Sequence, residues 1–145
     1  PPRGVLFLAF LICIAAFAAC RNASGPGTVN VTLDDRSIKP DRASMSPGNV
    51  TFEVSNKGKV DHELILVRTD FASDKLPVLT ADGGKHKKGD VDLTRAGVMS
   101  VGDVTDIAPG ARSTKIFSVA KGKYALICNI PGHYSDGMYT AFVVQ

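Results

Sequence analysis

Near its C-terminus the chain reads Cys128-Asn129-Ile130-Pro131-Gly132-His133-Tyr134-Ser135-Asp136-Gly137-Met138. A thiol, an imidazole and a thioether follow one another at the spacing C-x4-H-x4-M, between two apolar runs that have the composition of β-strands. Pro131 and Gly132 predict a turn. A turn can bring the side chains of Cys128 and His133 to one point, which a straight strand could not do. This region therefore predicts a strand, a loop that presents these side chains, and a second strand.

Upstream of this loop, apolar and polar residues mostly alternate with a period of two, the pattern of a half-buried strand. Turn signals such as Ser46-Pro47-Gly48 and Ala108-Pro109-Gly110 separate the runs. The predicted strands cover residues 29–33, 50–54, 63–68, 116–119, 124–128 and 139–144. Several short strands at such spacing predict an all-β domain over residues 28–145, an antiparallel Greek-key β-sandwich or barrel.

The stretch 70–111 does not fit this pattern, because it is long, mixed in polarity and rich in Gly, Asp and Lys. A structureless loop of that length is uncommon in a compact domain. We therefore expect a partly helical insertion, with a short helix or partial strand near residues 76–79 and another near 98–104. Met45 and Met99 are expected in the core.

Residues 1–20 differ in composition from the rest of the chain. Arg3 precedes an uncharged apolar run, 5–19, which is typical of a secretory signal peptide and shorter than the roughly 20 residues of a membrane span. The run ends in Phe17-Ala18-Ala19-Cys20, which resembles a bacterial lipobox. The resemblance implies an exported protein, periplasmic or at the cell surface, that is anchored to the membrane by a lipid on Cys20.

Two other interpretations of the leader stay open. The sequence Ala16-Phe17-Ala18 has the A-x-A form of an ordinary cleavage site, and an uncleaved signal anchor is also compatible with the apolar run. Residues 21–27 are small and polar, and they predict a flexible tether between the leader and the domain.

Cysteine and charge counts exclude several classes of protein. Cys13 and Cys20 belong to the leader, so only Cys128 remains in the domain and no disulfide within it can form. The formal net charge is +3, with Lys and Arg scattered along the chain, so there is no nucleic-acid footprint. We expect a monomer.

The residue types point to copper. Taken alone, Cys128 would more often be an inert buried thiol, and Met138 a core residue. Together with His133 and the upstream His62, however, they make the thiolate, two imidazoles and thioether of a blue-copper site. Zinc would accept the thiolate and imidazoles, but thioether is a poor ligand for it. The remaining histidine, His86, lies in a cationic Gly- and Lys-rich loop and is expected at the surface.

The motif resembles the ligand loop of the cupredoxins, the plastocyanin and azurin superfamily, and its spacing is most similar to the rusticyanin and auracyanin type. Residues 61–66 resemble the strand that opens with the first histidine ligand, and 122–128 the strand that leads into the cysteine. The resemblance implies one type 1 copper held by His62, Cys128, His133 and Met138. It also implies single-electron transfer between redox protein partners, with His133 nearest the surface.

Catalytic alternatives are limited by the residue counts. Multicopper oxidases and copper nitrite reductases need further histidines for a second copper centre, and this chain has three in total. A binuclear centre needs a second Cys in the loop, and the nucleophile of a Cys-His hydrolase normally sits at a helix N-terminus or beside a base. We therefore expect no enzyme. A copper carrier or storage protein without a redox role remains the alternative.

Overall fold

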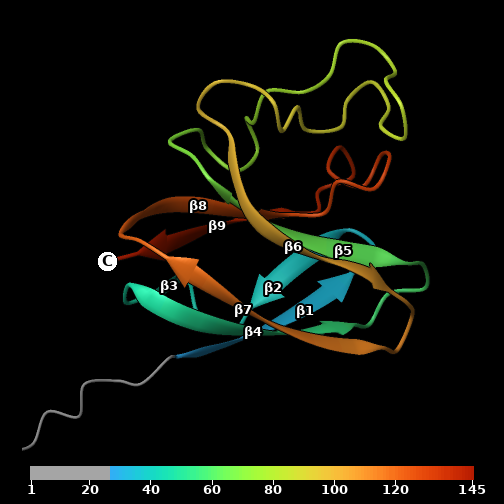
Figure 1. Ribbon diagram of the computed structural model, residues 1–145. Helices are drawn as coiled ribbons and strands as arrows, with labels where there is room; N and C mark the ends of the chain where they lie inside the picture. The colour runs from blue at the N-terminus through green and yellow to red at the C-terminus, as the bar shows by residue number, and fades with distance from the viewer. Residues whose placement is uncertain (1–26) are drawn as a thin grey trace, which may run out of the picture.

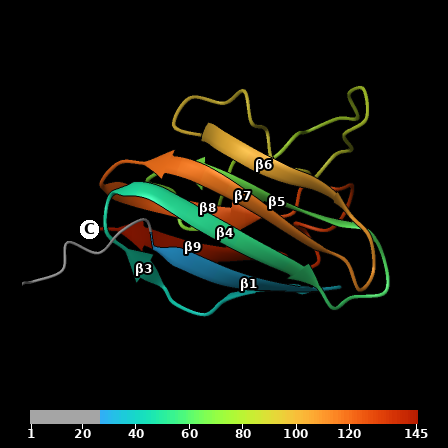
Figure 2. The same cartoon turned by 60° about the horizontal axis from the view of Figure 1, so that its bottom comes forward.

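The computed structural model describes residues 27–145, and all the regular elements in that range are β-strands. Nine strands form two sheets that face one another (Figures 1 and 2). In order across the first sheet lie β2 (Ser37–Pro40), β1 (Thr28–Asp34), β4 (Gly48–Asn56) and β7 (Arg112–Val119). In order across the second lie β3 (Ser44–Met45), β9 (Tyr139–Val144), β8 (Gly122–Ile127), β5 (His62–Arg68) and β6 (Met99–Ile107).

The predicted all-β sandwich is confirmed, but its sheets are mixed rather than purely antiparallel. β1 pairs in parallel with β4, and β3 in parallel with β9. The short strands β2 and β3 carry the chain from the edge of the first sheet to the edge of the second before β4 returns beside β1. The sequence did not predict these two strands, because Pro40 and Pro47 give the region the appearance of consecutive turns.

The core lies between the two sheets and follows the predicted alternation. In β4, Val50, Phe52 and Val54 are buried while their neighbours are more exposed. Phe52 contacts Phe117 of the same sheet edge-on at 5.5 Å between ring centroids, and Phe142 of the facing sheet at 5.8 Å. These aromatic contacts join the sheets at the centre of the sandwich.

The second sheet is covered on both faces, which explains the uninterrupted apolar run in β5. Residues 64–67 are all buried, because the segment between β5 and β6 folds over the outer face of this sheet (Figure 1, green to yellow). This outer cluster combines buried residues of the strands with buried residues of the loops. The strands contribute Ile65, Val67, Ala125 and Ile127, the segment between β5 and β6 contributes Leu76, Val91 and Val98, and the loop between β8 and β9 contributes Tyr134. A strand buried on both faces loses its alternating pattern.

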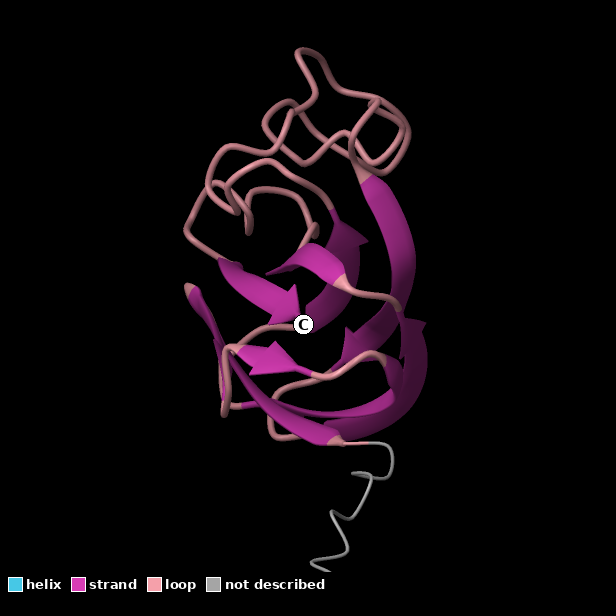
Figure 3. Cartoon of the chain, turned by 90° about the vertical axis from the view of Figure 1, so that its left-hand side faces the viewer, coloured by secondary structure: helices cyan, strands magenta, loops and turns pink. Residues whose placement is uncertain are grey.

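The helical part of the prediction for 70–111 is wrong. Among the described residues there is no helix, as Figure 3 shows, and the segment consists of turns, two isolated bridges and β6. Val78 bridges Val91 where a partial strand was expected near 76–79, and β6 covers the second expected element. The buried apolar residues of this loop are too widely spaced to give a helix an apolar stripe.

Two further predictions concern single elements. Met45 is partly buried against the core as expected, whereas Met99 is 52% exposed at the start of β6, so the core assignment of Met99 is wrong. Residues 27–145 contain no helix long and apolar enough to cross a bilayer. The predicted leader, 1–20, and all but the last residue of the predicted tether, 21–27, lie outside the described residues.

Candidate metal centre

The four predicted ligand residues come from one end of the second sheet. His62 opens β5, Cys128 follows β8, and Met138 precedes β9. The antiparallel register pairs Ile65 with Ile127, so the residue after β8 falls beside the start of β5. Strand pairing thus brings two residues 66 positions apart in the sequence to the same site.

Three of these side chains converge on a common point. Nδ1 of His62 lies 3.2 Å from Nδ1 of His133, which lies 3.3 Å from Sγ of Cys128. The ligand atoms of the three residues all lie within 4.8 Å of one another. His62 and Cys128 are fully buried, while His133 is partly exposed. Three donor atoms at such separations could hold one metal ion between them.

Met138 lies in the same loop and is fully buried. The backbone N–H of Cys128 donates to the Met138 carbonyl at 3.1 Å, and the Met138 N–H donates to the His133 carbonyl at 3.1 Å. These bonds close the loop on itself, and Gly132, at φ 86°, allows the turn that a side chain would disfavour. Residues 128–138 therefore form a compact loop that carries Cys128, His133 and Met138.

Burial determines the protonation states of the donor groups at the site. Burial raises the pKa of the Cys128 thiol to about 11, although the backbone N–H groups of Glu63 and Ile130 act in the opposite direction. Burial, followed by the neighbouring His62, lowers the pKa of His133, so its imidazole is neutral and keeps a free lone pair. Such a thiol becomes a thiolate when a metal ion supplies the missing positive charge. Thiolate, imidazole and thioether donors together fit copper.

Several polar contacts close to the site were not predicted from the sequence. The backbone N–H of Asn129 donates to Oε1 of Glu63 at 3.0 Å. Burial raises the pKa of the Glu63 carboxyl, which this hydrogen bond partly opposes. Asp35 lies 3.3 Å from Nε2 of His62, and the backbone N–H of Lys59 is the largest cause of the lowered pKa of its carboxyl.

Two buried polar side chains connect the ligand loop to the long segment above it. Asn129 accepts from the Val91 N–H at 2.6 Å and donates to the Val91 carbonyl at 3.0 Å. Asp90, fully buried, accepts from the Gly132 N–H at 3.0 Å and from the Lys87 N–H at 2.7 Å. In the sequence only the position of Asn129 beside Cys128 hints at this role, and nothing marks Asp90.

The prediction for His86 is only partly right. Its side chain is 30% exposed, and its Nδ1 is covered by protein, 3.7 Å from Asp90. His86 also lines a cavity of about 420 Å³ that opens beside His133. Val60, Asp61, Ile130 and Pro131 also line this cavity. His86 does not belong to the converging group, as expected.

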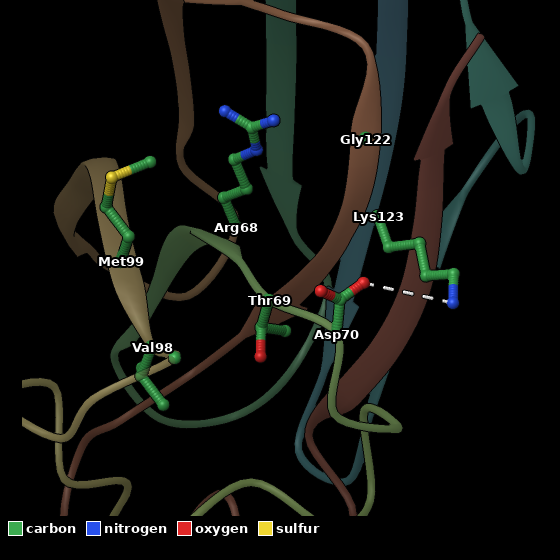
Figure 4. Close-up of a pocket in the computed structure, with 8 residues that line it drawn as sticks. Arg68, Thr69, Asp70, Val98, Met99, Gly122 and Lys123 are labelled. Carbon is green, nitrogen blue, oxygen red and sulfur yellow. Dashed lines mark ion pairs between the residues drawn. The ribbon is translucent and has the colours of Figure 1, made fainter.

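A second hollow, of about 390 Å³, lies at the far end of β5 (Figure 4). The exposed pair of Lys123 and Asp70, 3.9 Å apart, borders it beside Arg68. The described residues that line this hollow include no imidazole and no thiol. Among the described residues, the group that could hold a metal ion lies at the other end of β5, where this strand begins.

Comparisons with known sequences agree with this site. Residues 44–145 match the family model described as the Sulfocyanin (SoxE) domain. A sulfocyanin of Sulfolobus acidocaldarius is 26% identical over 97 residues, which are 66% of this chain and 46% of that protein. The chain therefore matches about half the length of this relative.

Solved structures share the fold. An auracyanin of Roseiflexus castenholzii superposes with a TM-score of 0.56 at 18% identity, covering 84% of this chain and 98% of that one. A rusticyanin superposes with a TM-score of 0.57 at 17% identity, covering 84% and 79%. Auracyanin and rusticyanin are described as copper proteins. The predicted cupredoxin-like architecture is thereby confirmed.

Proposed function

The chain belongs to the sulfocyanin (SoxE) family of cupredoxins, the blue copper electron carriers, and on this premise we propose that it carries single electrons outside the cytoplasm. In this proposal His62, Cys128, His133 and Met138 hold one copper ion. The observation that carries it is the convergence of one ligand atom each from His62, Cys128 and His133 within 4.8 Å, together with the full burial of Met138 in the same loop.

Copper supplies a one-electron couple between Cu(I) and Cu(II), and the chain's own residues supply the rest. The thiolate and thioether suit the softer Cu(I), while the imidazoles suit both states. Strand pairing and the closed loop hold the donor atoms in place from both sides, and burial of His62 and Cys128 keeps water away. Such a site needs little rearrangement when its charge changes, which favours fast electron transfer.

The alternative function is copper carriage or storage. A carrier must release its ion and tends to use exposed, exchangeable ligands, whereas here only His133 is partly exposed. This burial supports retention of the ion. The test is an absorption spectrum of the copper-loaded protein, which we expect to show an intense visible band that bleaches on reduction and returns on oxidation. Rapid loss of copper to a weak chelator in both redox states would instead support the carrier.

We propose that electrons leave through the edge of His133 to a redox protein that binds transiently. Pro131 and Gly132, which directly precede His133 in the chain, are exposed, and Val60, which is 47% exposed, lines the same cavity as His133. Tyr134, the next residue in the chain after His133, does not contribute to this surface, because it is buried and its hydroxyl donates to the Ser73 carbonyl at 2.9 Å. A small contact surface suits brief binding between redox partners.

We further propose that the protein is a monomer at the membrane surface, anchored by a lipid on Cys20 after export. Support comes from the apolar run 5–19 and the lipobox-like residues that follow it. Cys20→Ala should release a soluble form or leave an unprocessed precursor, as fractionation would show. An unmodified N-terminus at Ala19, found by mass spectrometry, would favour simple secretion instead.

A further inference from the structure

The two nitrogens of the His62 ring face different partners. Nδ1 points to the metal site, 3.2 Å from Nδ1 of His133, while Nε2 lies 3.3 Å from Oδ1 of Asp35. Asp35 follows β1 directly and is 42% exposed at its side chain, whereas the His62 ring is fully buried. The carboxylate is therefore the polar group that a buried imidazole meets on its far side.

The position of this carboxylate is held by the backbone. The N–H of Lys59 donates to the same Oδ1 of Asp35 at 2.7 Å. Gly58, the preceding residue, leaves the space that the pair occupies, because a Cβ there would overlap Oδ1 of Asp35 and lie 2.7 Å from Nε2 of His62. The turns after β1 and β4 are thus shaped around this contact.

We propose that Asp35 is a positioning residue for His62, a role that rests on the proposed copper function. An ionised carboxylate can only accept, so the hydrogen of the neutral ring must sit on Nε2, and Nδ1 is left with its lone pair directed at the metal site. The negative charge also strengthens electron donation from the ring to a bound ion, which would stabilise Cu(II) relative to Cu(I). Asp35 therefore sets both the tautomer of His62 and part of the reduction potential.

The first test compares reduction potentials in two variants of equal charge. Asp35→Asn keeps an oxygen that can accept from both donors but removes the charge, and should raise the potential by about 59 mV, a tenfold change in the one-electron equilibrium. The matched control is Asp34→Asn, since Asp34 is 44% exposed and contacts Lys39 rather than a ligand. An equal shift in both variants, or none in Asp35→Asn, would overturn the proposal.

The second test needs no copper. In the metal-free protein at neutral pH, nitrogen-15 NMR should find the His62 hydrogen on Nε2. Asp35→Ala, and equally Gly58→Ala, should give a mixture of the two tautomers. A hydrogen on Nδ1 in the parent chain, or an unchanged Nε2 tautomer in Asp35→Ala, would contradict the role of Asp35. A chain that never turns blue with copper would refute the proposed function, and this NMR test would still decide about Asp35.

Discussion

At Cys128, burial and hydrogen bonding have opposite effects on the pKa of the thiol. Burial dominates and raises the pKa of the thiol to about 11, while the N–H of Glu63, 3.5 Å from Sγ, stabilises the thiolate. The metal-free thiol is therefore protonated at neutral pH and gives up its proton only when a cation replaces it. This behaviour suits the proposed role of the sulfur as a metal ligand rather than as a nucleophile.

The first prediction follows from this ligand role. Cys128→Ser should abolish the intense visible band of the copper-loaded protein, because that band needs a thiolate. The fold should persist, but the free energy of unfolding should fall by about 1–3 kcal/mol, because the serine hydroxyl is buried with few hydrogen-bond partners. Absorption spectroscopy and circular dichroism on the same sample measure both effects. A variant that stays blue would show that Cys128 is not a ligand.

The second prediction concerns Glu63 and pH. Because burial raises its folded-state pKa above the ordinary 4.5, folding favours the protonated carboxyl. Its favourable contribution is fully present below pH 4.5 and is lost as the pH rises through the folded-state pKa. Glu63→Gln is neutral throughout and keeps an acceptor for the Asn129 N–H. The metal-free variant should therefore melt higher than the parent at pH 7 and nearly equal to it at pH 3.5.

The control for this comparison is Glu53→Gln, which changes an exposed residue of β4. It should leave the difference in melting temperature between the two pH values almost unchanged. If Glu63→Gln instead lowers the melting temperature at pH 7, the hydrogen bond from Asn129 to the ionised carboxylate outweighs the cost of burying it.

At the scale of elements, the segment between β5 and β6 does more than cover the sheet. Its buried Asp90 and Val91 bind the backbone and side chain of the ligand loop at Gly132 and Asn129. The hydroxyl of Tyr134 also accepts from the Leu76 N–H at 3.0 Å. The loop that bears three of the four candidate ligands is thus supported by residues that are not themselves candidate ligands.

The third prediction tests this support. Asp90→Ala leaves the N–H groups of Gly132 and Lys87 without their acceptor, so the free energy of unfolding should fall by about 2–4 kcal/mol. Urea unfolding of the metal-free protein measures the loss, and copper should also pass to a chelator faster. The control is Asp82→Ala, an exposed carboxylate of the same segment that accepts from the Lys88 N–H at 2.9 Å.

Asp82→Ala should cost less than about 1 kcal/mol, because water can replace an exposed acceptor. If the two alanine variants lose the same stability, or if copper release is unchanged in Asp90→Ala, the segment does not support the ligand loop.

At the scale of the whole molecule, the candidate metal site lies at one end of the sandwich and is therefore far from the protein surface at the other end. The candidate ligands gather at the end of the second sheet where β5 begins, and His133 is the only one with partial exposure. Val143 lies near the end of β9 that is farthest from Met138. The C-terminus of the chain lies toward the same end of the strands (Figure 1). Electron exchange should therefore depend on charge at one end and not at the other.

The fourth prediction uses this separation. Val60→Lys places a charge beside the cavity next to His133, and should slow electron self-exchange between oxidised and reduced copies by about five- to tenfold. The copper spectrum should not change, since Val60 is exposed and not a ligand. NMR line broadening in mixtures of the two redox states measures the rate. Val143→Lys adds the same charge at an exposed position on β9 and should have little effect.

Equal slowing in the two lysine variants would mean that net charge, rather than the surface around His133, controls the encounter. An unchanged rate in Val60→Lys would mean that electrons leave elsewhere.

The sequence by itself determined the fold class and the candidate ligands, because both are recorded locally. Alternating apolar residues mark a strand wherever it lies, and the turn at Pro131 and Gly132 keeps Cys128, His133 and Met138 within one loop. His62 could be added because the domain offers only one other histidine besides His133, and that one lies in a cationic loop.

Only the tertiary structure decided what surrounds those ligands. The contacts of Asp35 with His62, Asp90 with Gly132 and Glu63 with Asn129 join residues 27, 42 and 66 positions apart. No periodicity records such pairs, since each depends on which strands are neighbours and in which register. For the same reason the segment 70–111 was misread as partly helical: its few apolar residues are buried by packing on the outer face of β5 and β8, and not by a repeat of their own.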